Sequence, residues 1–111
     1  MRNISFSMTT QAFKDHRKTV TRRIGWAEVK PGDVLMGIEK GQGLKKGERV
    51  VRLGKICVVG ARWEPLDCID QADVIREGFP GMTPEQFIQM FCKHNKWEPG
   101  KDVRRIEFEY L

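Results

Sequence analysis

The chain has 111 residues, enough for one domain with a single modest core, so we treat residues 1–111 as one domain. Hydrophobic residues make up 40% and charged residues 32%, as in ordinary globular proteins, and no apolar run reaches membrane-spanning length. Lys and Arg number 20 against 15 Asp and Glu, a net charge of +5 that favours a polyanionic partner, nucleic acid first.

The three cysteines, Cys57, Cys68 and Cys92, are widely spaced and form no CxxC or Cys/His metal pattern. The segment 1–6 lacks the hydrophobic core of a signal peptide. We therefore expect reduced thiols, a cytoplasmic location, and no bound metal or cofactor.

The first elements expected are a strand and a helix. Apolar and polar residues alternate over 3–8, which is typical of a half-buried strand. Thr9 or Thr10 can cap a helix that runs over about 11–17. His16 falls in its last turn, where we predict a complement to the negative end of the helix dipole rather than a metal ligand or a catalytic base.

A basic segment follows at once: Arg17-Lys18-Thr19-Val20-Thr21-Arg22-Arg23. A lysine beside threonines can bind an anion or assist a hydroxyl as nucleophile, and paired arginines can grip phosphate or carboxylate. The alternative is a basic strand edge whose charges are solvated. In a straight strand Lys18 and Thr21 would point to opposite faces, so they share a site only if the chain bends here.

The middle of the chain is rich in strand signals. A turn at 30–33 leads into a buried strand over 34–38. The glycine-rich connection 41–48 does not match a phosphate-binding P-loop, and we predict a hairpin tip whose Lys45 and Lys46 could touch phosphate. Residues 49–63 predict one long strand bent at a glycine, or two successive strands.

Two helices are expected next. Asp67 or Asp70 can cap a short helix that ends just before Gly78. Glu77 then lies at the helix C-terminus, where the dipole disfavours a carboxylate, so it is either solvated or has a role. Thr83 to Gln86 forms a capping box that opens a second helix. The stripe of this helix predicts core packing, and it consists of Phe87, Met90, Phe91 and, at the helix end, His94.

A final strand is expected near the end of the chain. Ile106, Phe108 and Tyr110 alternate with charged residues, which indicates one dry and one wet face. Strands at both ends around a mostly antiparallel set predict an α+β fold: a small β-barrel, closed by both termini, with flanking helices.

The segment that begins Lys18-Thr19-Val20-Thr21-Arg22 resembles the K-T-x-T-x-R signature of ASCH domains, which belong to the PUA-like superfamily. Pro31-Gly32-Asp33-Val34-Leu35, Arg76-Glu77-Gly78-Phe79 and the terminal Ile106-Glu107-Phe108 agree with it in order and spacing. The resemblance covers essentially the whole chain and is closest to short bacterial and phage-type members. It implies a PUA-like barrel, a cleft near the signature, and RNA or a modified nucleoside as partner.

One branch of the family hydrolyses the N4-acetyl group of acetylcytidine, with a lysine, a threonine and a glutamate that correspond here to Lys18, Thr21 and Glu77. The resemblance implies Thr21 as nucleophile and Lys18, with a depressed pKa, as the group that deprotonates or positions it. Glu77 would bind the cytosine edge or relay a proton. The glycine-rich insertion at 41–47 departs from that branch.

The alternative is RNA binding without catalysis, or RNA cleavage as in other relatives. The residues expected to contact nucleic acid are Arg17, Thr19, Arg22, Arg23, Trp26, Lys45 and Lys46. Trp26 or Trp63 could stack a base, against the alternative that each packs in the core. A third possibility, which charge and length permit, is a phage accessory protein that contacts a host protein through the same basic face. We expect a monomer.

Overall fold

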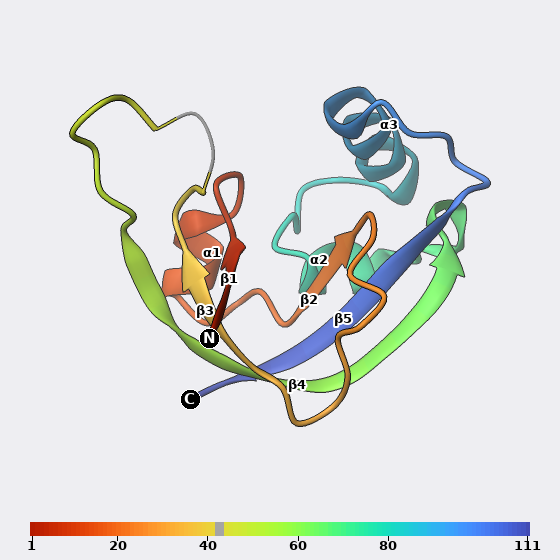
Figure 1. The fold of residues 1–111 in the computed structure, drawn as a ribbon. Coiled ribbons are helices and arrows are strands. Elements are labelled where there is room, and N and C mark those ends of the chain that lie inside the picture. The colour runs from red at the N-terminus through yellow and green to blue at the C-terminus, as the bar shows by residue number, and fades with distance from the viewer. Residues whose placement is uncertain (42–43) are drawn as a thin grey trace.

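The computed structural model describes residues 1–41 and 44–111. Within these residues, five strands form one sheet in the order β1-β3-β4-β5-β2 (Figure 1). Their bounds are β1, Arg2–Ser5; β2, Val20–Arg23; β3, Val34–Ile38; β4, Arg52–Pro65; and β5, Asp102–Tyr110. Only the β1–β3 pairing is parallel among the described strands. The long β4 and β5 curve strongly, so that the sheet forms a half-barrel.

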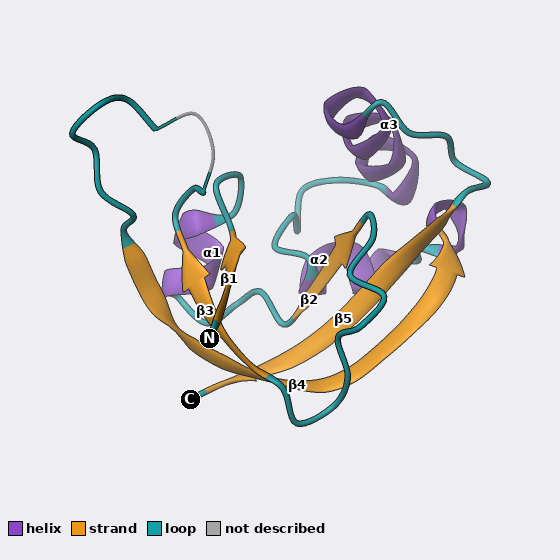
Figure 2. Ribbon diagram, viewed as in Figure 1, coloured by secondary structure: helices purple, strands orange, loops and turns teal. Residues whose placement is uncertain are grey.

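In the described residues, three α-helices and one 3-10 turn complete the fold (Figure 2). They are α1, Thr10–Lys14; α2, Gln71–Arg76; α3, Pro84–Asn95; and the 3-10 turn Leu66–Cys68. The expected small α+β PUA-like barrel with flanking helices is therefore confirmed. No helix in the described ranges is long and apolar enough to cross a membrane.

The expectation that both termini close the barrel is wrong. The C-terminal β5 lies inside the sheet, between β4 and β2, while β1 and β2 form the two edges. β5 reaches that position because its nine residues pair along most of β4, and the short β2 then adds to its free side. The half-barrel consequently stays open between β1 and β2.

Two hydrophobic clusters hold the fold together. The first fills the inside of the half-barrel and consists of Ile4, Phe6, Phe13, Val29, Leu35, Ile56, Val58, Ile106 and Phe108. Phe13 of α1 packs on buried Gly37, where a Cβ would lie 2.5 Å from the ring. The second joins α2 and α3 to the far end of the sheet, with Leu66, Ile69, Val74, Phe87, Phe91 and Val103. The space between these clusters is where polar residues gather.

The first strand and the first helix are shorter than expected. The strand ends at Ser5, because a turn closes with the Thr9 N–H on the Phe6 carbonyl (3.0 Å). α1 ends at Lys14, and His16 adopts a left-handed φ of 57°. His16 therefore lies outside the helix and stacks on Tyr110, with ring centroids 4.0 Å apart. The expected position of His16 in the last turn of the helix is wrong, and its dipole role stays a prediction.

Most later elements agree with expectation. The strand over 34–38 is β3, and 52–65 forms one strand whose register shifts between Val58 and Gly60. Asp70 caps α2 by accepting from the Asp73 N–H (2.8 Å), and the capping box of Thr83 is present. Of the expected hairpin tip 41–48, residues 42 and 43 lie outside the described residues.

Candidate functional site

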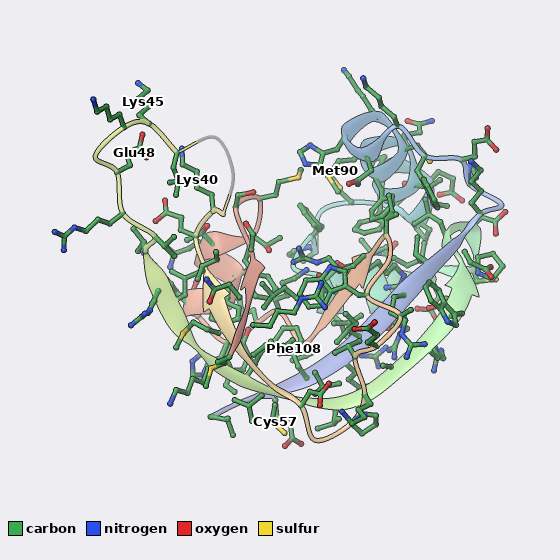
Figure 3. All side chains as sticks on the ribbon, viewed as in Figure 1. Lys40, Lys45, Glu48, Cys57, Met90 and Phe108 are labelled. Carbon is green, nitrogen blue, oxygen red and sulfur yellow. The ribbon has the colours of Figure 1, made fainter. Side chains whose placement is uncertain are left out.

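A cavity of about 670 Å³ lies in the mouth of the half-barrel. The β3–β4 connection forms one side of the cavity and α3 the other (Figure 1). We call residues 39–41 and 44–51 of this connection the arm. Met90 projects from α3 toward the space between them (Figure 3). Among the residues that line the cavity, we call Lys18, Thr21, Arg22, Arg23 and Glu77 the polar wall and Phe79, Phe87 and Phe91 the aromatic wall.

Lys18 reaches this cavity because the chain bends just before β2. The Lys18 N–H donates to the Ala12 carbonyl (3.3 Å), and the Thr19 N–H donates to the Arg76 carbonyl (2.9 Å). The Tyr110 hydroxyl donates to the Lys18 carbonyl. Burial raises the pKa of Tyr110 to about 12, so this hydroxyl remains a donor. These bonds tie the segment to α1, α2 and β5, and Lys18 and Thr21 line the same cavity.

Glu77 is brought to Lys18 by the end of α2. Gly78 follows with a φ of 100°, which lets the chain leave the helix at once. A Cβ at Gly78 would lie 3.0 Å from the Cβ of Ala12 and 3.8 Å from that of Lys18. The close approach of these backbones places the carboxylate over the lysine.

Lys18 and Glu77 form a buried ion pair. The Lys18 Nζ lies 2.9 Å from Glu77 Oε1 and 2.7 Å from the Glu77 carbonyl, and both residues are at most 3% exposed. The second carboxylate oxygen accepts from Arg22 Nη1 at 3.1 Å. Burial lowers the pKa of Lys18, and the attraction of Glu77 opposes that shift. A lysine with a lowered pKa is closer to the neutral form that acts as a base.

Thr21 and Arg23 point to the same side of β2. Thr21 pairs with Ile106 of β5, and its Oγ1 accepts from Arg23 Nε at 3.0 Å. Arg23 Nη2 donates to the Ser5 carbonyl across the open edge (2.5 Å). Burial lowers the pKa of Arg23 to about 10, opposed by the attraction of Glu77. Since Arg23 occupies an acceptor position of the Thr21 hydroxyl, the Thr21 proton can be donated to another group.

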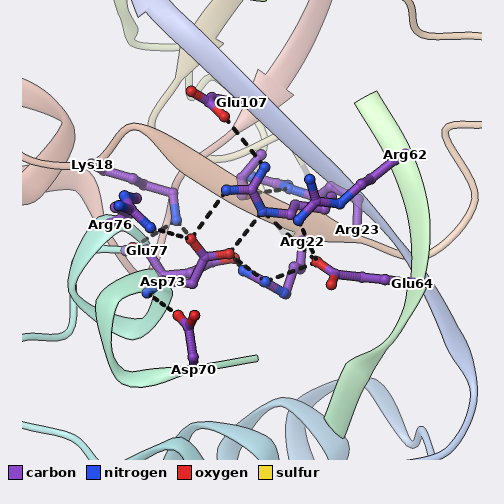
Figure 4. A network of polar contacts seen from close by, with 12 residues as sticks. Lys18, Arg22, Arg23, Arg62, Glu64, Asp70, Asp73, Arg76, Glu77 and Glu107 are labelled. Atoms are coloured by element: carbon purple, nitrogen blue, oxygen red, sulfur yellow. Dashed lines mark hydrogen bonds and ion pairs between the residues drawn. The ribbon is translucent and has the colours of Figure 1, made fainter. Parts of the chain in front are cut away.

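Arg22 also lines the cavity, but its guanidinium lies in a buried network of charges (Figure 4). Arg22 Nη2 contacts Glu64 (3.0 Å) and Asp73 (2.5 Å). Asp73 also accepts two bonds from Arg105, at 2.7 and 3.1 Å. Burial alone would raise the pKa of Asp73, but hydrogen bonds from Arg105, Arg22 and Arg76 bring it well below its usual range.

The other expected contacts to nucleic acid are scattered. Arg17 is exposed and pairs with Asp15 (3.1 Å), and Thr19 is half-buried before β2. Lys45 and Lys46 are exposed on the arm, away from the cavity lining (Figure 3). Arg22, with three carboxylates around its guanidinium, is poorly placed to meet a phosphate. These contacts stay predictions.

The two tryptophans considered for base stacking, Trp26 and Trp63, differ. Trp26 is half-buried and lines the cavity. Trp63 is 47% exposed on β4, so core packing is wrong for it. Between residues 1–41 and 44–111, no three His, Cys, Asp or Glu side chains cluster in a way that would hold a metal ion.

Sequence reasoning missed Glu64, Asp73 and Arg105. Arg105 was placed on a wet face of the last strand, yet it is 8% exposed because α2 covers that end of the sheet. One available signal is that Asp73 and Glu77 are four residues apart, on one face of α2 and its end. Two acidic residues on that face could have suggested basic partners.

No family model matches this sequence, and no curated protein does. Solved structures do resemble it. Protein EF3133 from Enterococcus faecalis V583, of the family DUF984, has a TM-score of 0.71 at 16% identity, over all of this chain and 80% of its own. Hypothetical protein PH0355 has a TM-score of 0.69 at 18% identity, over the whole of both chains.

An ASCH domain from Lactobacillus crispatus JV V101 also superposes on this protein. Its TM-score is 0.64 at 8% identity, over 98% of this chain and 79% of its own. At these identities the likeness concerns the fold. The chain has the fold of an ASCH domain, as the sequence resemblance implied.

Proposed function

We propose that this protein binds a modified nucleoside in the cavity and hydrolyses the N4-acetyl amide of acetylcytidine. The observation that carries the proposal is the meeting of Lys18, Thr21 and Glu77 on one cavity wall, although Lys18 and Glu77 are 59 residues apart in the chain. An amide hydrolase needs a nucleophile, a base and a group that orients the substrate, and these three side chains supply those roles.

The size and lining of the cavity suit a nucleoside. Its volume of about 670 Å³ is within the usual range for small-molecule sites. The aromatic wall of Phe79, Phe87 and Phe91 offers apolar contact, while the polar wall offers groups for the edge of a base. A carboxylate on a wall that is otherwise basic has no use in binding phosphate, but it can accept the amide N–H of acetylcytidine.

The reaction follows from these positions. The carboxylate of Glu77 accepts the substrate's N4–H, which frees Lys18 to turn toward Thr21. Neutral Lys18 takes the hydroxyl proton as Thr21 Oγ1 bonds to the acetyl carbonyl carbon. The C–N4 bond breaks, N4 receives that proton from Lys18, and cytidine leaves. Water then cleaves the acetyl ester on Thr21, which releases acetate and restores the hydroxyl.

Arg23 has a role in the same reaction. Its Nε lies 3.0 Å from Thr21 Oγ1, so its positive charge is close to the carbon that Thr21 attacks. The negative charge of the tetrahedral intermediate forms beside this guanidinium and is stabilised by it.

The test is incubation with N4-acetylcytidine, with release of cytidine followed by chromatography. We expect turnover by the unmodified protein and loss of at least about 100-fold in Thr21→Val, which keeps the side-chain volume and removes the hydroxyl. Lys18→Met and Glu77→Gln should also lose turnover. Thr21→Ser keeps a hydroxyl and should retain part of it.

The matched control is Lys101→Met, a lysine outside the cavity lining. Unfolding in urea for every variant separates loss of chemistry from loss of fold, since Lys18 and Glu77 are buried. Full activity in folded Thr21→Val, or no turnover by the folded unmodified protein, refutes the hydrolase.

The lowered pKa of Lys18 makes a separate prediction. Only neutral Lys18 accepts the proton, so kcat/KM should rise with pH and level off above the pKa of Lys18. Because burial lowers that pKa, the midpoint of the rise in kcat/KM should lie at a pH below the usual lysine pKa of about 10.4. A pH–rate profile measures it, and a rate independent of pH from 6 to 10 would argue against Lys18 as the base.

A second candidate function is RNA binding without catalysis. It is favoured by the exposed cations of the arm, Lys45, Lys46 and Arg49, which lie beyond the cavity lining, where a nucleoside would not reach them. RNA binding that weakens steeply with salt, and weakens less steeply in Lys45→Ala/Lys46→Ala, would support it. It becomes the better account if acetylcytidine is not hydrolysed.

A further inference from the structure

We propose that Trp26 is the stacking platform for the base in this cavity, held from behind by Arg2. This inference rests on the proposed function, because it names the surface that takes the base of the same nucleoside. The Arg2 guanidinium lies 3.5 Å from the centroid of the Trp26 ring. Arg2 itself does not line the cavity, although Trp26 does. Trp26 thus contacts Arg2 and also presents part of its surface to the cavity.

The backbone of Trp26 also points to a role. Trp26 has a φ of 57°, in the left-handed region that bulky side chains rarely adopt, and it follows Gly25 with a φ of 80°. Such strained positions cluster at ligand sites, where the surrounding structure enforces them. Here the strain is held by a turn in which the Val29 N–H donates to the Trp26 carbonyl (3.3 Å), and by packing of the indole on the first hydrophobic cluster.

The position suits a base whose edge reaches the catalytic wall. Trp26 comes three residues after Arg23, and both line the cavity with Lys18, Thr21 and Glu77. Aromatic stacking is available to every base because each has a π-face. The groups that distinguish acetylcytidine lie on its edge, so Trp26 supplies affinity and the polar wall supplies selectivity.

Trp63 provides a matched control within the same chain. It also stacks with an arginine, since the Arg104 guanidinium lies 5.1 Å from its ring centroid. Trp63 does not line the cavity and is 47% exposed. If packing on an arginine were enough for a tryptophan to bind a base, Trp26 and Trp63 would both bind one. Only Trp26 should.

The experiment uses cytidine, which has the base and ribose but no acetyl group to lose. Binding is measured by calorimetry for the unmodified protein, Trp26→Leu, Trp26→Phe and Trp63→Leu. We expect roughly 10- to 100-fold weaker binding in Trp26→Leu, a change of a few-fold in Trp26→Phe, and none in Trp63→Leu. Arg2→Ala should weaken binding only a few-fold, because it removes the support and leaves the ring.

A second measurement needs no variant and covers the case in which Trp26→Leu does not fold. In NMR spectra of the unmodified protein, the H5 and H6 protons of bound cytidine should show nuclear Overhauser effects to indole protons of Trp26. Effects to Trp63 instead, or no binding of cytidine, would overturn the inference.

Failure of this inference and failure of the proposed function are distinguishable. Turnover of acetylcytidine with unchanged KM in folded Trp26→Leu would overturn the stacking role and leave the hydrolase intact. Cytidine binding that depends on Trp26, without turnover of acetylcytidine, would refute the hydrolase and support the stacking role.

Discussion

The arginines on the two faces of β2 differ in their hydrogen-bond partners. On one face, Arg22 is surrounded by the carboxylates of Glu64, Asp73 and Glu77. On the other face, Arg23 donates only to neutral groups, the Thr21 hydroxyl and the Ser5 carbonyl. Two adjacent arginines therefore differ in whether their charge is compensated.

This difference separates charges that hold the fold from charges available to a ligand. A buried charge that is fully paired gains little from the opposite charge of a ligand. Arg23 has no such ion pair among the described residues, and burial lowers its pKa to about 10, so the folded protein disfavours its charge. An oxyanion or a polar base edge would relieve that cost. The cavity side of β2 is accordingly the side where we place recognition and chemistry.

The largest effect on stability should come from Asp73→Ala. Asp73 accepts from Arg22, Arg105 and Arg76, and its loss leaves two buried guanidiniums short of a counter-charge. We expect the free energy of unfolding in urea to fall by about 3–5 kcal/mol.

The control for that change is Asp15→Ala. Asp15 pairs with Arg17 on the surface, so its loss should have no measurable effect. Equal effects of the two changes would mean that burial does not distinguish the network.

The pH dependence of stability should report the same carboxylate. The pKa of Asp73 is lower in the folded state than in the unfolded chain, so between those two values the unfolded chain binds more protons. Its contribution is present above about pH 4 and is lost as the pH falls further. Acid unfolding of the unmodified protein should show this loss, and Asp73→Asn should give a flatter curve over that range. Parallel curves would contradict the assignment.

The Lys18–Glu77 pair links the two faces, since Glu77 also accepts from Arg22. A double-mutant cycle of Lys18→Met and Glu77→Gln measures the coupling free energy in urea unfolding. We expect about 2 kcal/mol, because the pair is buried and hydrogen-bonded. Additive effects would show that the contact does not contribute to stability, and would weaken the case that Glu77 holds Lys18 in place.

A smaller effect on stability than for the carboxylates of the network is expected for Arg23→Met. It removes a charge that forms no direct ion pair with a carboxylate among the described residues, so the free energy of unfolding should change by no more than about 1 kcal/mol. Turnover should nevertheless fall by about 100-fold or more, as for loss of an oxyanion donor. Arg22→Met gives the matched control, with a larger loss of stability. If Arg23→Met were the more destabilising of the two, the contrast between the faces would be wrong.

Part of this picture could be predicted from the sequence. The capping residues Asp70 and Thr83 marked α2 and α3, and the alternation ending at Tyr110 marked β5, because these signals act within a few residues. The signature around Lys18 indicated the fold and directed attention to Glu77.

Contacts across the chain could not be predicted in this way. The bend that lets Lys18 and Thr21 line one cavity depends on a bond to Ala12 and on bonds to Arg76 and Tyr110, which are distant in sequence. Burial of Arg105 likewise depends on α2 packing over the end of β5. No local sequence pattern indicates which of two neighbouring arginines contacts the carboxylates.

The most direct test of the contrast is an NMR titration that follows the side-chain Nε–H signals of Arg22 and Arg23 as cytidine is added. We predict that the Arg23 signal shifts in a saturable way, because Arg23 lines the cavity and forms no ion pair with a carboxylate among the described residues. Arg22 also lines the cavity, but three carboxylates hold its guanidinium. The Arg22 signal should stay where it is. A shift of Arg22 with Arg23 unmoved would contradict the account, as would saturable binding that moves neither.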